Sequence, residues 1–485
     1  MASALSSTPS ARNYVGGAWA SAVSGETYVK MNPMHPSGST GSYALSDSAD
    51  VAAAVDAAAG AFPGWAALPI ARRGAYLGAA ADAVERSAEA IACDMAAEMG
   101  KPLREARGEA ARAAQILRFA AAEAFRPTGE RFEQAATGTE VSTRRRPLGI
   151  VALITPWNFP CAIPAWKLAP ALVYGNTVVL KPAYESPATA LHLAAAFAEA
   201  DLPPGVLNVL TGKGSSAGAA LVRDPQVRAI SFTGSVATGH GIRDEATRNG
   251  KRVQLELGGQ NPLIVMADAD LDRAVEASYA GAYWSAGQKC TATRRILVQD
   301  AIYETFRERL VARIERCVVG DPLDPAVEVG PIVSKAQFDE VLAAIEQAKS
   351  EGGRVLTGGG PVGEDGYLIA PTLFENVADD ALLSCEEVFG PVAALYRFAT
   401  LDEALARANS VEFGLSAGIF TSDLGAALRF QDEAQAGLLH VNSQTAGADV
   451  HVPFGGIKAS GFGPHEQGRA AAEFYTETVT VYVDP

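Results

Sequence analysis

A chain of 485 residues is long enough for two or three domains, and a hydrophobic content of 48% allows a large buried core. With 20% charged residues and scattered glycine and proline, the composition argues against disorder. The formal net charge of −15 disfavours nucleic acid as a partner, because an acidic surface repels polyanions.

The five cysteines are far apart and form no CxxC pair, which favours a reducing compartment over a disulfide framework. Six scattered histidines without an HExxH pattern predict no metal site. The first residues lack the apolar stretch of a secretory signal, and prolines interrupt the most apolar region, residues 149–182. We therefore expect a cytoplasmic protein without a membrane span.

Helical periodicity dominates the early chain, over residues 48–62 and 71–119. Ser48 is the expected N-cap of the first helix. From residue 149 the pattern changes to short apolar runs separated by helices at 187–200 and 216–223. We expect buried strands at residues 149–154, 177–181, 206–210 and 229–233. This alternation predicts a parallel sheet, which binds ligands at the carboxyl ends of its strands.

A second α/β pattern follows a change of domain near Gly258 and Gly259, where two glycines permit a bend. Asp268 or Asp270 is expected to cap a helix that runs towards Ala286. The expected strands of this second part are residues 262–266, 295–298, 354–356, 393–398 and 418–421.

One turn of the first part suits a phosphate group. Residues 232–239 end a strand and open a helix, so free backbone N–H groups and the helix dipole meet there. Gly234 lets a ligand approach, and Ser235 is able to donate a hydrogen bond. Such turns often contain glycine and serine without a ligand, so the motif alone decides nothing.

Two residues in particular favour covalent chemistry. Cys290 lies just beyond a predicted helix with polar neighbours, and Lys289 is expected to favour its thiolate. Glu256 lies between two leucines; burial would raise its pKa and make it a general base near neutral pH. The alternatives are a small buried cysteine and a glutamate that faces water.

A different class of enzyme is also considered. Residues 214–218, GSSAG, match the GxSxG pattern of serine hydrolases, with Ser216 as the nucleophile. No HGG segment accompanies the motif, and no acid or base partner is identifiable in the sequence.

Taken together, several motifs resemble the aldehyde dehydrogenase superfamily, and they occur in the family's order over about residues 13–483. They are TPWNFP (155–160), KPA (181–183), FTGS (232–235), LELGG (255–259), GQKC (287–290), EVFGP (387–391) and PFGG (453–456).

The resemblance implies an α/β fold in three parts. These are a Rossmann-like cofactor domain (residues 1–125 and 148–257), an α/β catalytic domain (258–455) and a small β oligomerisation arm (126–147 and 470–485). Residues 478–483, TVTVYV, alternate as a pairing edge strand would. A homodimer or homotetramer is implied.

The resemblance also implies a mechanism. The Cys290 thiolate attacks the aldehyde carbon, and the Asn158 amide and the Cys290 backbone N–H stabilise the oxyanion. Hydride transfer to NAD or NADP leaves a thioester, which water activated by Glu256 hydrolyses. Lys167 and Glu466 resemble the family's proton path, although residues 463–466, GPHE, depart from its usual GxGRE.

Cofactor positions follow from the same resemblance. Gly234 and Ser235 face the pyrophosphate, and Trp157 and Lys181 lie along the adenosine. Glu387 binds the nicotinamide ribose, with Phe389 packed near it.

Tyr184 departs from the family, since NAD-preferring members usually have a glutamate at this position. A carboxylate there would repel a 2′-phosphate, so we expect NADP to be accepted alongside NAD.

For the substrate, residues 162–167, 447–456, 463–469 and 473–476 resemble enzymes that oxidise 2-oxoglutarate semialdehyde. A remote carboxylate favours a cation at the tunnel mouth, and Arg294, at an often small position, is the candidate. An aromatic aldehyde such as a benzaldehyde is the competing choice. Acylating relatives generally lack the glutamate found here at position 256, so water rather than CoA is the expected acceptor.

Overall fold

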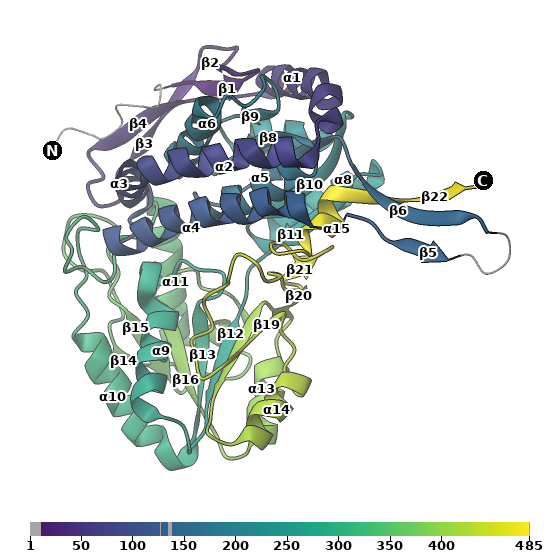
Figure 1. The fold of residues 1–485 in the computed structure, drawn as a ribbon. Helices are drawn as coiled ribbons and strands as arrows, with labels where there is room; N and C mark the ends of the chain where they lie inside the picture. Colours follow the sequence, from purple (N-terminus) through teal and green to yellow (C-terminus); the bar gives the residue numbers. More distant parts are fainter. Residues whose placement is uncertain (1–10, 127, 134–137, 485) are drawn as a thin grey trace.

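Two large β-sheets organise the chain, one in the upper and one in the lower half of Figure 1. The computed structural model describes residues 11–126, 128–133 and 138–484. The expectations that concern residues 1–10, the arm residues 127 and 134–137, and residue 485 lie outside that part of the chain. Both sheets are parallel through their central strands and are covered by helices, so the predicted α/β class is confirmed.

The first sheet has the order β2-β1-β9-β8-β7-β10-β11-β21. Its strands are β1 (Asn13–Val15), β2 (Ala18–Ala20), β7 (Ile150–Ile154), β8 (Thr177–Lys181), β9 (Leu207–Val209), β10 (Val227–Thr233), β11 (Arg252–Glu256) and β21 (Gly461–Phe462). The four strands expected in this region are all present, because each is a mainly apolar segment that is buried over nearly its whole length.

Alternate residues of β7 pack into the two cores that cover opposite faces of this sheet. Val151 and Leu153 join the core built with α2 to α6, whereas Ile150, Ala152 and Ile154 join the core beneath α1, α7 and α8. These helices are α1 (Ser48–Ala67), α2 (Ile70–Arg86), α3 (Ala88–Met99), α4 (Leu103–Ala122), α5 (Ala162–Val173), α6 (Ala188–Glu199), α7 (Ala219–Arg223) and α8 (Val236–Arg248).

The start of α1 differs by one residue from the expectation. Asp47, not Ser48, is the N-cap: its carboxylate accepts the Ala49 N–H, and Asp50 completes a capping box. The helical stretch expected over residues 71–119 is three helices. Gly100 ends α3 in a left-handed conformation (φ 80°), and Pro102 immediately precedes α4.

The second sheet has the order β14-β15-β16-β13-β12-β18-β19. Its strands are β12 (Asn261–Val265), β13 (Thr293–Gln299), β14 (Arg354–Thr357), β15 (Thr372–Glu375), β16 (Val392–Phe398), β18 (Ser416–Phe420) and β19 (Leu438–Val441). Its helices are α9 (Leu271–Tyr283), α10 (Tyr303–Glu315), α11 (Lys335–Ser350), α12 (Leu382–Cys385), α13 (Leu401–Asn409) and α14 (Leu424–Glu433). Asp270, one of the two expected caps, accepts the Arg273 N–H at 3.1 Å.

The chain passes from the first sheet to the second between Glu256 and Asn261, around the glycine pair. It returns at β21, which pairs with β11. Short pairs complete the structure: β3 (Thr27–Met31) with β4 (Ser39–Ala44), and β17 (Phe413–Gly414) with β20 (Ile457–Lys458).

A three-stranded arm projects from the body in Figure 1. It contains β5 (Arg131–Glu133), β6 (Glu140–Pro147) and the C-terminal β22 (Thr476–Val483), which follows the short helix α15 (Ala471–Tyr475). β22 pairs antiparallel with β6 from Thr476↔Pro147 to Val483↔Glu140.

Within the described residues no single helix is both long enough and apolar enough to cross a membrane. Helices α1 and α2 meet both criteria only when taken together, and they are bent by 119° relative to each other.

Candidate active site

Cys290 is one of the residues that line a pocket of about 410 Å³. Helix α4 forms one wall, and aromatic side chains and the residues around position 447 form others. The residues that line it are Lys101, Glu105, Gly108, Glu109, Arg112, Gln115, Phe159, Ala162, Trp166, Ser285, Lys289, Cys290, Thr291, Ala446, Gly447, Ala448 and Phe454.

The loop before Cys290 has an unusual backbone. Ser285 and Ala286 have φ values of 56° and 53°, a left-handed region that costs non-glycine residues about 1–3 kcal/mol each. Glu105 of α4 holds this loop: its carboxylate accepts the Ser285 N–H at 3.2 Å and the Ser285 hydroxyl at 2.6 Å. The helix of one half of the molecule therefore positions the loop of the other.

The surroundings of Cys290 favour its protonated thiol over the thiolate. Burial raises its pKa to about 12, and the carboxylates of Glu387 and Glu256 add to the rise, while the Thr291 and Cys290 N–H groups oppose it. Lys289 lies within Coulombic range of the thiol, and the Cys290 thiolate would raise the pKa of Lys289. Its Nζ donates to the Ala280 carbonyl at 2.9 Å, and burial lowers its own pKa to about 8.

Glu256 ends β11 as a buried carboxyl group. Burial raises its pKa well above the usual value, the Glu466 carboxylate raises it further, and Lys167 opposes both. Its Oε2 accepts the Gly456 N–H at 3.2 Å. Because Glu256 also raises the pKa of Cys290, the two groups share one electrostatic environment.

Behind Glu256 lies a buried polar chain. Lys167 of α5 forms an ion pair with Glu466 and donates to the Ser231 hydroxyl at 2.7 Å. Ser231 is 3.0 Å from the Gln254 side-chain oxygen. The structure thus brings Lys167 and Glu466 together, although they are far apart in sequence, within Coulombic range of Glu256.

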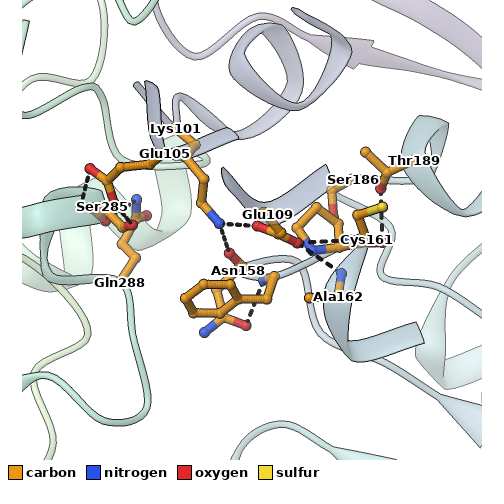
Figure 2. A network of polar contacts seen from close by, with 12 residues as sticks. Lys101, Glu105, Glu109, Asn158, Cys161, Ala162, Ser186, Thr189, Ser285 and Gln288 are labelled. Atoms are coloured by element: carbon orange, nitrogen blue, oxygen red, sulfur yellow. Dashed lines mark hydrogen bonds and ion pairs between the residues drawn. The ribbon is translucent and has the colours of Figure 1, made fainter. Parts of the chain in front are cut away.

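Asn158 lies in the loop between β7 and α5, held by the network in Figure 2. Lys101 donates to the Asn158 carbonyl at 2.7 Å and forms a buried ion pair with Glu109. Glu109 also accepts the Cys161 and Ala162 N–H groups, at 2.9 and 3.0 Å, where α5 begins. The Asn158 side-chain NH₂ has no hydrogen bond to any described residue, so it is free to donate elsewhere.

The carboxyl ends of β7 and β10 have unsatisfied polar groups. The hydroxyls of Thr155 and Thr233 are buried without a hydrogen-bond partner in the described part of the chain. Next to Thr233, Gly234 donates its N–H to the Glu256 carbonyl at 3.1 Å. Exposed Ser235 precedes α8, and its Oγ lies 2.9 Å from Thr238 Oγ1. This edge suits a ligand with several hydrogen-bonding groups.

Further along this edge lie Lys181 and Tyr184. Lys181 donates to the Pro182 and Gly212 carbonyls, at 2.7 and 3.1 Å; burial lowers its pKa to about 8, while Glu185 opposes the shift. The Tyr184 ring stacks on Tyr28 with 4.0 Å between ring centroids.

Glu387, Phe389 and Trp157 meet on the side of the second sheet. Burial raises the pKa of Glu387 to about 7, and Arg294 opposes that rise. The carboxylate accepts the Gly259 N–H at 3.1 Å, and a Cβ at Gly258 would lie 2.0 Å from one of its oxygens, so a larger residue at position 258 would displace the Glu387 carboxylate. Trp157 packs edge-on against Phe389 with centroids 5.3 Å apart.

Arg294 does not have the place expected of it. It is buried, donates to the Gly390 and Gly287 carbonyls at 2.6 Å each, and does not line the pocket. Its guanidinium thus connects the loop of Gly287 with the loop of Gly390.

Ser216 lies exposed in a π-helical turn (Gly214–Gly218), and its hydroxyl has no hydrogen bond to a described residue. The hydrolase alternative therefore gains no support from the geometry.

Four charged pocket residues were not identifiable as site residues from the sequence: Lys101, just before α4, and Glu105, Glu109 and Arg112 on α4. Charges within an alanine-rich helical stretch were the sequence signal for the three helical residues.

Comparison with known proteins agrees with this geometry. Residues 19–481 match the aldehyde dehydrogenase family. The alpha-ketoglutaric semialdehyde dehydrogenase of Bacillus subtilis is 46% identical, with 98% of each chain covered. The betaine aldehyde dehydrogenase of Staphylococcus aureus, solved with NAD⁺, superposes with a TM-score of 0.96 at 31% identity, covering 99% of this chain and 95% of that one. An NADP-dependent enzyme of E. coli gives 0.95 at 36% identity, with 98% of both chains covered.

The family match covers residues 19–481, nearly the whole chain, and the fold, the pocket cysteine and the buried glutamate agree with it. The protein is therefore an enzyme of the oxidoreductase class. The chain belongs to the aldehyde dehydrogenase family.

Proposed function

We propose that the protein oxidises an aldehyde to a carboxylic acid through a thioester on Cys290. The observation that supports this most directly is that Cys290 lines the pocket while the buried carboxyl of Glu256 lies within electrostatic range of its sulfur. Glu256 takes the thiol proton as the sulfur bonds to the aldehyde carbon. The free Asn158 NH₂ and the Cys290 N–H stabilise the oxyanion that results.

Glu256 has a second role in this proposal. It removes a proton from the water that hydrolyses the thioester, which frees Cys290 and releases the acid. The ion pair of Lys167 and Glu466 is the route by which that proton leaves the buried carboxyl. Since Glu256 is present, water rather than CoA is the acceptor.

NAD or NADP is the proposed cofactor, and when bound its nicotinamide supplies the hydride acceptor. The unpartnered hydroxyls of Thr155 and Thr233 fit a polar ligand at this strand edge. In the proposal Gly234 and Ser235 bind the pyrophosphate. The residues that contact the remaining parts of the cofactor are Trp157, Lys181, Tyr184, Glu387 and Phe389. Both cofactors are accepted; a kcat/KM ratio above ~10³ in favour of NAD would contradict this.

An aldehyde with a remote carboxylate, such as 2-oxoglutarate semialdehyde, is the proposed substrate, in line with the name of the Bacillus subtilis relative. An aromatic aldehyde is the second candidate, because Phe159 lines the pocket and Trp166 lies 5.3 Å from Phe454, ring centroid to ring centroid. We further propose a cytoplasmic homodimer or homotetramer assembled through the arm, with domain boundaries near residues 125, 147, 257 and 455.

Two substitutions test the chemistry. Cys290→Ser should abolish aldehyde oxidation, whereas Glu256→Gln should slow deacylation by ~10²–10⁴ and let the thioester accumulate. Intact-mass measurement after mixing with aldehyde and cofactor detects the acyl adduct, and Cys385→Ser, an exposed cysteine, is the matched control. Full oxidation by Cys290→Ser would refute the mechanism. Esterase activity that survives in Cys290→Ser and is lost in Ser216→Ala would favour the hydrolase.

A further inference from the structure

Three cationic side chains line the pocket within the described residues, and two of them are already engaged. Lys101 is paired with Glu109 and donates to the Asn158 carbonyl. Lys289 donates to the Ala280 carbonyl. The third, Arg112, has no hydrogen bond to any described residue.

Arg112 is poorly satisfied for a guanidinium in its position. Its side chain is 32% exposed, and the one acid paired with it among the described residues is Asp449, whose side chain is 73% exposed and lies 3.9 Å away. An exposed pair of that length contributes little. A guanidinium has five N–H donors and keeps its charge at physiological pH, so a partly buried one with a single long ion pair favours an anionic ligand.

The acids in the same pocket do not neutralise it. Glu109 is paired with Lys101 and accepts two backbone N–H groups, and Glu105 accepts two hydrogen bonds from Ser285. Glu105 and Arg112 are two helical turns apart, about 10 Å along α4. Glu105 contacts the loop that leads to Cys290, so Arg112 lies further along the wall, beside Gln115 and the residues around 447.

We propose that Arg112, assisted by Gln115, binds the remote carboxylate of the substrate while the aldehyde carbon lies at Cys290. The inference deepens the proposed function and rests on it: the substrates are oxo-acids with an aldehyde at one end and a carboxylate at the other. Arg112 thus has the part that the sequence suggested for Arg294. A planar fork binds a carboxylate through two parallel hydrogen bonds, which lysine does not reproduce.

The test compares substrates that differ only in the remote charge. Steady-state kinetics with glutaric semialdehyde and with its neutral amide, in which the carboxylate is a carboxamide, give a selectivity ratio of kcat/KM values. Wild type should favour the acid. In Arg112→Ala and Arg112→Gln that ratio should fall by ~10–10², mainly through KM, and Arg112→Lys should recover only part of it.

Arg107→Ala is the matched control, because Arg107 lies on the same helix, is exposed, and pairs with Glu89 outside the pocket. An unchanged ratio in all three Arg112 variants, or a wild type that favours the amide, would overturn the inference. The wild-type comparison holds even if a variant fails to fold. A wild type that oxidises no aldehyde of any charge would instead refute the proposed function, so the two failures are distinguishable.

Discussion

At the scale of single residues, the electrostatics of Cys290 determine when it becomes a nucleophile. Burial and two nearby carboxyl groups favour the protonated thiol, so we expect slow oxidation and alkylation of the resting site. Activation then requires proton removal at the moment of attack. The raised pKa of Glu256 makes that carboxyl a stronger base than an exposed glutamate.

This arrangement predicts the pH dependence of Cys290 alkylation without cofactor. The thiolate fraction lies below one half at any pH under the thiol's pKa of about 12, so the rate should rise about tenfold per pH unit through neutrality. Glu387→Gln removes a negative charge and should lower the thiol's pKa, which speeds alkylation most above pH 7, where Glu387 is ionised. Iodoacetamide labelling followed by mass spectrometry measures both; a plateau near neutral pH in wild type would contradict the prediction.

At the scale of elements, α4 connects the parts of the site. Its Glu109, together with Lys101 just before the helix, holds the Asn158 loop and the start of α5. Its Glu105 holds the loop of Cys290, and its Arg112 faces the pocket. A single rigid helix therefore sets the distance between the proposed oxyanion donor and the nucleophile.

Glu109→Ala tests the strength of that connection. The change leaves the Lys101 ammonium buried without its counter-charge and two N–H groups without an acceptor, which should destabilise the protein by about 3–5 kcal/mol. Glu89→Ala breaks the exposed pair with Arg107 and should cost about 0–1 kcal/mol. Urea unfolding followed by tryptophan fluorescence compares them; equal losses would mean that the buried network is not structural.

At the scale of the whole molecule, the arm formed by β5, β6 and β22 projects away from the two large sheets and their helices. On β22 the residues Tyr482 and Val483 are 65% and 54% exposed, and β22 is an edge strand of its sheet. An edge strand with exposed apolar residues favours pairing with another chain.

The proposed assembly can be weakened at this strand. Replacing Tyr482 and Val483 together by aspartate places charges on the exposed apolar end and should shift the protein towards smaller species in sedimentation velocity. Tyr482→Phe preserves the apolar surface and should leave the assembly intact. Identical sedimentation of the aspartate variant and wild type would show that the arm's tip is not an interface.

Sequence by itself determined the elements and the chemical groups. The buried strands were predictable because a continuous apolar run such as residues 177–181 is a local signal, and Cys290 and Glu256 were identifiable because their motifs are local too. β15 and β19 were missed because their short segments have little periodicity. The cap of α1 was misplaced because two neighbouring polar residues are both good N-caps, and only the backbone chooses between them.

Tertiary structure alone decided which charges meet. Arg294 and Arg112 look equally available in the sequence, yet packing buries Arg294 against backbone carbonyls and leaves Arg112 on the pocket wall without a hydrogen bond to the described part of the chain. Likewise, the pKa of Cys290 depends on Glu256 and Glu387, which come from other segments of the chain. The physical reason is that hydrophobic periodicity specifies which face of a helix or strand is buried, whereas desolvation and Coulombic interactions depend on partners that only the packed fold brings within reach.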